Sequence, residues 1–136
     1  MILLDTNVCI GFLHGDSDIV QRLGTVLEHE EIGIPGMVEG ELHYGVEKST
    51  HREENREKTA LLLSLLPVYH TTDAIMAKFG ELKAELEAAG NRVDDADLII
   101  AATALCHDAV LATGNTRHFE RFQNLKLENW FRETKH

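Results

Sequence analysis

Residues 2–7 read ILLDTN, three aliphatic side chains followed at once by three polar ones. A short aliphatic run bounded by polar residues is typical of a buried strand, and residues 8–13 have a pattern compatible with a short helix. We therefore expect a buried strand at residues 2–4 that leads directly into a helix. The side chain of Asp5 would then project at the carboxyl edge of the sheet.

Strand and helix signals alternate along the rest of the chain. Short apolar runs predict further strands at residues 32–34, 68–69, 109–112 and 125–127. Helical spacing of apolar residues predicts helices over 19–27, 37–46, 53–66, 72–88 and 97–105. Helices of this length do not fit hairpin connections, so the pattern predicts an α/β fold. We expect one domain over residues 1–136, with a short-stranded, mainly parallel sheet flanked by helices on both faces.

Composition and charge narrow the class of protein. The 136 residues are 43% apolar and 26% charged, as in an ordinary globular domain. The apolar runs are far shorter than the roughly 20 residues of a membrane span, and the N-terminus lacks the basic start of a secretory signal, so we expect a cytoplasmic protein. The formal net charge is −10, with the acidic excess almost wholly within residues 1–88. This charge argues against a general nucleic-acid coat and favours a cation or a basic partner.

The two cysteines, Cys9 and Cys106, lie far apart in the sequence, each within an apolar stretch. A domain of this length builds a core without disulfides. We expect two buried thiols in a reducing compartment.

Acidic side chains at two positions have both a structural and a functional interpretation. Asp5 precedes a helix, where it or its neighbours Thr6 and Asn7 would cap the first turn. Glu41 shares a helical stripe with residues 38, 42 and 45, so its carboxylate falls on the face that should be buried. An ionised carboxylate there is costly unless it is paired or binds a metal. Glu41 therefore either lies at the helix margin or belongs to a site.

Asp97 opens the most apolar helical segment of the chain. It too has a capping alternative, for which Asp94 and Asp95 compete. Three acids within four residues repel one another unless a cation is near. Because no Cys or His stands at metal-ligand spacing around Asp5, Glu41 and Asp97, hard oxygen ligands favour Mg²⁺ or Mn²⁺ over zinc.

A last polar cluster, TGNTRHF at residues 113–119, directly follows an expected strand. As a structural element it contains a turn signal and a cap for a helix over residues 117–122. As a site it would bring Thr113, Asn115 and Arg117 to the same sheet edge as Asp5, where ligands of open sheets bind.

The order of these motifs resembles that of the PIN-domain ribonucleases, and within them the VapC toxins of bacterial and archaeal toxin–antitoxin pairs. The motifs are LLDTN at residues 3–7, Glu41-Leu42-x-x-Gly45, Asp97-x-x-Ile100-Ala101-Ala102-x-Ala104, and TGNTRHF at 113–119. The resemblance runs from residue 2 to Trp130 and covers nearly the whole chain.

This resemblance implies a PIN-like fold and a Mg²⁺- or Mn²⁺-dependent endoribonuclease that cleaves structured RNA such as tRNA loops. It also implies inhibition by a cognate VapB-like antitoxin, a homodimer and larger toxin–antitoxin assemblies. The family's metal-binding and catalytic positions fall on Asp5, Glu41, Asp97 and Asn115. Substrate contacts are then expected from Thr6, Asn7, Thr113 and Arg117.

Three residues depart from the family pattern. Thr103 stands where many relatives have His, and Gly114 where many have Asn; we expect these two to alter packing or substrate contacts. His118 stands where many relatives have Glu. We expect a surface imidazole there, and the alternative is a neighbour of the site that makes activity sensitive to pH.

Two other function classes remain in competition with hydrolysis. A PIN-like binding domain, whose acids cap helices and dock a basic protein, fits the acidic surface equally well. An aspartyl-phosphate phosphatase or receiver fits worse, because no Asp-x-Asp follows the first strand and no Lys stands near the end of a late one. In the hydrolytic interpretation Asp5 and Asp97 hold the metal, Glu41 completes the cluster or orients water, and Asn115 positions a water or a phosphate oxygen.

Overall fold

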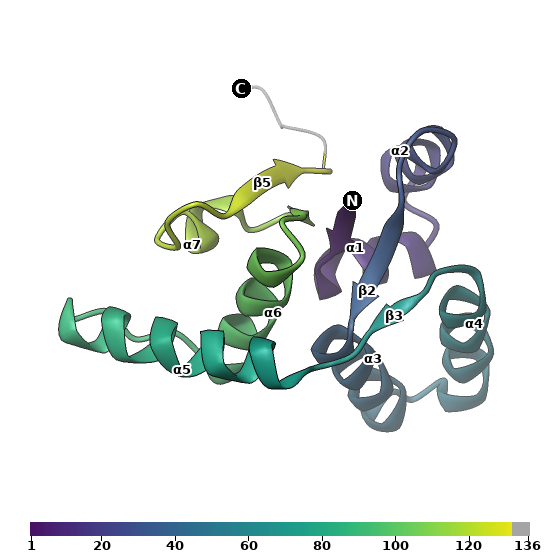
Figure 1. Ribbon diagram of the computed structural model, residues 1–136. Helices are drawn as coiled ribbons and strands as arrows, with labels where there is room; N and C mark the ends of the chain where they lie inside the picture. Colours follow the sequence, from purple (N-terminus) through teal and green to yellow (C-terminus); the bar gives the residue numbers. More distant parts are fainter. Residues whose placement is uncertain (132–136) are drawn as a thin grey trace, which may run out of the picture.

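Strands and helices alternate through residues 1–131, the part of the chain that this computed structural model describes (Figure 1). The elements are β1 (Ile2–Leu4), α1 (Thr6–Leu13), α2 (Ser17–Leu27), β2 (Ile32–Pro35), α3 (Gly36–Lys48), α4 (Arg52–Leu65), β3 (Val68–Tyr69), α5 (Asp73–Ala88), α6 (Asp95–Cys106), β4 (Val110–Thr113), α7 (Thr116–Phe119) and β5 (Lys126–Asn129). The predicted α/β fold is confirmed, with element bounds mostly within two residues of those expected. The helix expected over 117–122 ends earlier, at Phe119.

All the strand pairs are parallel, in the order β3-β2-β1-β4-β5. The chain moves from β1 to β2 and β3 on one side, and then crosses back to place β4 and β5 on the other. The order therefore reverses between β1 and β4, where Leu3 pairs with Leu111. Such a reversal leaves a crevice at the carboxyl ends of the two strands, which is where open sheets bind ligands.

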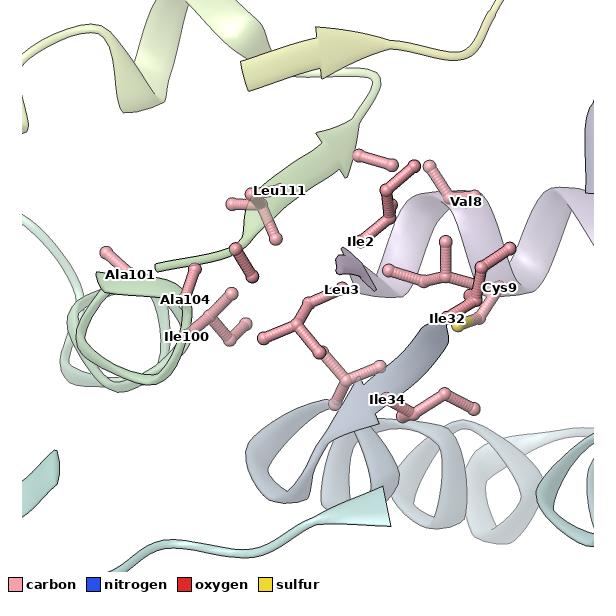
Figure 2. Close-up of a cluster of buried hydrophobic side chains, with 14 of the residues drawn as sticks. Ile2, Leu3, Val8, Cys9, Ile32, Ile34, Ile100, Ala101, Ala104 and Leu111 are labelled. Atoms are coloured by element: carbon pink, nitrogen blue, oxygen red, sulfur yellow. The ribbon is translucent and has the colours of Figure 1, made fainter. Parts of the chain in front are cut away.

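The core lies on both faces of the central strand β1. Leu3 points toward Ile100 of α6, while Ile2 points toward Val8 of α1 (Figure 2). All three residues of β1 are buried. A parallel strand covered on both faces needs apolar side chains on both, which explains why residues 2–4 read as a continuous aliphatic run.

The middle of helix α6 is apolar on every side, because the rest of the domain surrounds residues 98–104. Its buried residues are Leu98, Ile100, Ala101, Ala102, Thr103 and Ala104. The Thr103 hydroxyl donates to the carbonyl of Ile99 at 2.7 Å, so this departure from the family pattern is accommodated within the helix itself. Burial on this scale fixes the helix, and with it the acidic residues of its first turn.

The prediction of two buried thiols was wrong for one of them. Cys9 is buried in α1, but Cys106 is exposed at the last residue of α6. The final turn of α6 reaches the surface, and its position in an apolar stretch of sequence does not reveal this. No helix within residues 1–131 is long and apolar enough to cross a membrane. The predicted domain extends to residue 136, and residues 132–136 lie outside the described part of the chain.

Alkylation should distinguish the two thiols. We expect iodoacetamide to modify Cys106 in the native protein and to reach Cys9 only after unfolding, because burial, and then the nearby charge of Asp5, raises the pKa of the Cys9 thiol and keeps it protonated. Mass spectrometry with and without guanidinium counts the modified thiols. Rapid modification of Cys9 in the native protein would contradict this packing of α1.

Candidate functional site

Asp5 occupies the carboxyl end of β1, and its side chain is 6% exposed. Its Oδ1 accepts a hydrogen bond from the backbone N–H of Thr6 at 2.8 Å, which makes Asp5 the N-cap of α1. Its Oδ2 accepts a hydrogen bond from the Thr113 hydroxyl at 2.7 Å. Asp5 therefore caps α1 and also lies at the carboxyl edge of the sheet, in contact with the end of β4.

The charge on Asp5 is poorly neutralised. Burial raises the pKa of Asp5 above its ordinary value, the hydrogen bonds from Thr113 and Thr6 oppose this rise, and the negative charges of Asp97 and Glu41 add to it. The charges of Asp97, from α6, and of Glu41, from α3, thus both act on the buried Asp5 carboxylate. A cation at this position would lower the free energy of all three carboxylates.

Glu41 reaches the crevice from α3. It is half-buried on the same helix as the buried Val38 and Leu42, as the stripe predicts. Its Oε1 accepts a hydrogen bond from the Thr6 hydroxyl at 2.6 Å. Thr6 therefore connects two of the acids: its backbone N–H binds Asp5, and its hydroxyl binds Glu41.

Asp97 lies in the first turn of α6 without capping it. Asp94 is the N-cap residue of α6, and Asp95 pairs with Lys83 at 3.0 Å. The Oδ2 of Asp97 lies 3.0 Å from Nε2 of His118 on α7. The expectation of a surface imidazole was therefore wrong: His118 is half-buried and contacts one of the site acids, which joins α7 to the first turn of α6.

The first turn of α1 and the loop after β4 are joined by a hydrogen bond next to these acids. Asn7 Oδ1 accepts a hydrogen bond from the backbone N–H of Gly114 at 2.9 Å, and the backbone N–H of Asn115 donates to the Thr113 hydroxyl at 3.0 Å. Thr113 is fully buried, and its hydroxyl holds the Asp5 carboxylate by a hydrogen bond. Asn115 and Arg117, which follow β4, are exposed.

The donor set fits a hard divalent cation. Its ligands are carboxylate oxygens, and Mg²⁺ binds through one or two carboxylates while keeping several waters. Within residues 1–131, no three His, Cys, Asp or Glu side chains stand close enough together to hold an ion as they are placed. Joint coordination by Asp5, Glu41 and Asp97 would require these carboxylates to approach one another more closely than they do here.

Comparison with known proteins gives consistent matches. A family model described as PIN domain matches residues 2–125. The chain is 38% identical to Ribonuclease VapC2 of Rickettsia felis and 32% identical to the tRNA(fMet)-specific endonuclease VapC of Shigella flexneri, covering 94% of this chain and 96% of each relative. It is also similar, with a TM-score of 0.91 and 35% identity, to the crystal structure of VapBC2 from Rickettsia felis bound to a DNA fragment from their promoter; the match covers 96% of this chain and 100% of that one.

Replacing the buried acid should stabilise the metal-free protein. In EDTA we expect Asp5→Asn to raise the melting temperature by several degrees at neutral pH, because it removes a buried charge that Asp97 and Glu41 repel. Differential scanning calorimetry measures the change. The control is Glu57→Gln, which removes an exposed charge on α4 and should leave the melting temperature nearly unchanged.

The stabilisation should also depend on pH with a defined sign. Because the folded chain binds the Asp5 proton more tightly than the unfolded chain, the free energy of unfolding of the wild type contains a contribution that falls as pH rises from about 3.8 through the raised pKa. The advantage of Asp5→Asn should therefore grow over that window and level off above it. An advantage that shrinks with rising pH would show that the pKa of Asp5 is lowered by folding.

Proposed function

Because this chain belongs to the PIN domain family and, within it, to the VapC ribonucleases of toxin–antitoxin systems, we propose that it cleaves structured RNA at a Mg²⁺- or Mn²⁺-dependent centre formed by Asp5, Glu41 and Asp97. One observation carries the assignment of the centre. Asp5 is buried at the reversal of strand order, and its pKa is raised first by this burial and then by the negative charges of Asp97 and Glu41. A divalent cation would relieve the repulsion between Asp5 and the other two acids. Packing of the apolar core does not require a carboxylate at this position.

The chain's own residues hold the centre in place. Thr113 and Thr6 bind the two oxygens of Asp5, and the Thr6 hydroxyl also orients Glu41. His118 orients Asp97 through their 3.0 Å contact. The elements that carry these groups are held by the core, so the rearrangement that joint coordination requires would fall on the carboxylate side chains.

A divalent ion bound at this centre supplies a Lewis acid that activates water for attack on the phosphodiester and neutralises the charge that develops on the phosphoryl oxygens. Glu41 orients the attacking water. Asn115, which is exposed, positions a water or a phosphate oxygen. Arg117, exposed on α7, receives the RNA backbone.

Looped or single-stranded RNA is the substrate class that this site fits. A small domain reaches splayed bases more readily than the grooves of an A-form helix. Two relatives, from Shigella flexneri and Salmonella typhimurium, are tRNA(fMet)-specific endonucleases. This makes tRNA loops the first substrates to try, in the cytoplasm where tRNA is found.

The partner we propose is a VapB-like antitoxin with a basic segment. Similar chains were solved as VapBC complexes, two of them with DNA bound. A net charge of −10 provides the complementary surface for such a segment. Homodimers of this chain would then be joined with antitoxin into larger assemblies.

Cleavage of a total RNA pool tests the function. With Mg²⁺ or Mn²⁺ the purified chain should produce discrete fragments, and EDTA should stop cleavage. Asp97→Asn, and also Glu41→Gln, should lower the rate by about 100-fold or more without unfolding the protein, because each removes a carboxylate of the centre. The matched control is Asp95→Asn. Asp95 lies two residues before Asp97 and pairs with Lys83, so this variant should cleave RNA as fast as the wild type.

A second candidate is a protein-binding module for a basic partner. The separation of the three carboxylates favours it. Within residues 1–131, no three acidic, His or Cys side chains lie close enough together to hold an ion. A folded, antitoxin-free wild type that leaves the RNA pool intact with Mg²⁺ and with Mn²⁺ would support this module and reject the nuclease.

A further inference from the structure

Phe131, at the far end of the described chain, lies against α1 and the loop after β4, the two segments that follow Asp5 and Thr113. Its neighbour Trp130 is 2% exposed and packs into the core, whereas the Phe131 ring is half-buried. The backbone N–H of Phe131 donates to Asn129 Oδ1 at 2.9 Å. The backbone of Phe131 is therefore held by the anchored Trp130 and by its own hydrogen bond.

The ring of Phe131 lies against two glycines, one in α1 and one in the loop after β4. A Cβ at Gly114, in the loop after β4, would stand 2.6 Å from two ring atoms, and one at Gly11 of α1 would stand 3.4 Å from the ring. A side chain at Gly114 would therefore displace the ring. The departure from the family pattern at residue 114 thus makes room for Phe131. Asn7, two residues after Asp5, binds the same Gly114 N–H.

A shallow hollow of about 530 Å³ opens at the ring. Phe131, Ile10 and the backbone of Gly11 provide apolar walls, while Asn7 and His14 provide polar side chains. Asp16 also lines the hollow, and its Oδ1 accepts hydrogen bonds from the first turn of α2. Asn7 uses its carbonyl oxygen for Gly114, which leaves its amide N–H groups to donate elsewhere. An aromatic surface with amide and imidazole groups beside it is the combination that holds an unpaired base, which stacks on the ring and offers its edge for hydrogen bonds.

We propose that Phe131 and this hollow form a subsite for one unpaired nucleobase of the RNA substrate, next to the phosphate that is cleaved. The proposal rests on the ribonuclease function proposed above and gives it a substrate feature. Asn7 links the two, because it follows Asp5 by two residues and lines the hollow. A base stacked on Phe131 would hold the adjoining phosphate near the carboxylates, and it requires a strand that is locally unpaired.

Binding measurements test the subsite without relying on cleavage. The full chain carrying Asp97→Asn serves as the parent in every arm, so that RNA stays intact. The probes are fluorescently labelled hexauridylate, hexaadenylate and an abasic ribose-phosphate hexamer of the same charge, titrated with Mg²⁺ present and followed by anisotropy. Phe131→Leu should weaken binding of the two base-carrying hexamers by about 10-fold and leave the abasic hexamer unchanged, because stacking needs a base. Phe131→Trp should restore the affinity.

The control is Tyr44→Leu, which removes an aromatic ring that is 65% exposed on α3 and outside the hollow, and which should change none of the affinities. Equal affinity of the parent and Phe131→Leu for all three hexamers would overturn the subsite and would be expected if the ring docks a protein segment instead. Equal weakening for the base-carrying and abasic hexamers would also overturn it, because the effect would then not involve a base. Cleavage of total RNA by the wild type, measured separately, reports on the nuclease whichever way the binding falls.

Discussion

One hydrogen bond, from the Thr113 hydroxyl to the buried carboxylate of Asp5, holds together the place where the strand order reverses. It spans 2.7 Å and joins the carboxyl end of β4 to that of β1. With the Thr6 N–H on its other oxygen, Asp5 has a partner for each oxygen, which offsets part of the cost of burying a charge. The same carboxylate caps α1, so fold and site are fixed by the same atoms.

The remaining acids come from elements that the core holds rigid. Glu41 extends from α3, between Val38 and Leu42, which are both buried. Asp97 lies in the first turn of α6, the helix whose middle is buried, and Ile100 of this helix packs against β1 (Figure 2). Close-packed interiors change shape little, so the repulsion among the acids is not relaxed by movement of the elements that carry them. A cation at the proposed centre would offset the negative charge of these acids.

Sequence patterns predicted the parts of the structure that local chemistry determines. Asp5 was found because it ends an aliphatic run, and Glu41 because it interrupts an apolar helical stripe. The contact between His118 and Asp97 could not be found this way, because it depends on how α7 packs over α6, between residues 21 positions apart. Cys106 was misjudged because hydrophobicity along the chain does not show where a buried helix reaches the surface. Phe131 was missed because a single aromatic after a strand has no period to mark its direction.

The most direct test of this account is the affinity for Mn²⁺, measured by electron paramagnetic resonance on the wild type and on Asp5→Asn, Glu41→Gln and Asp97→Asn. In the proposed centre one cation binds all three carboxylates. The wild type should therefore bind Mn²⁺, and each substitution should weaken binding by roughly 10-fold or more. Binding that none of the three substitutions weakens would contradict a shared cation at the reversal between β1 and β4.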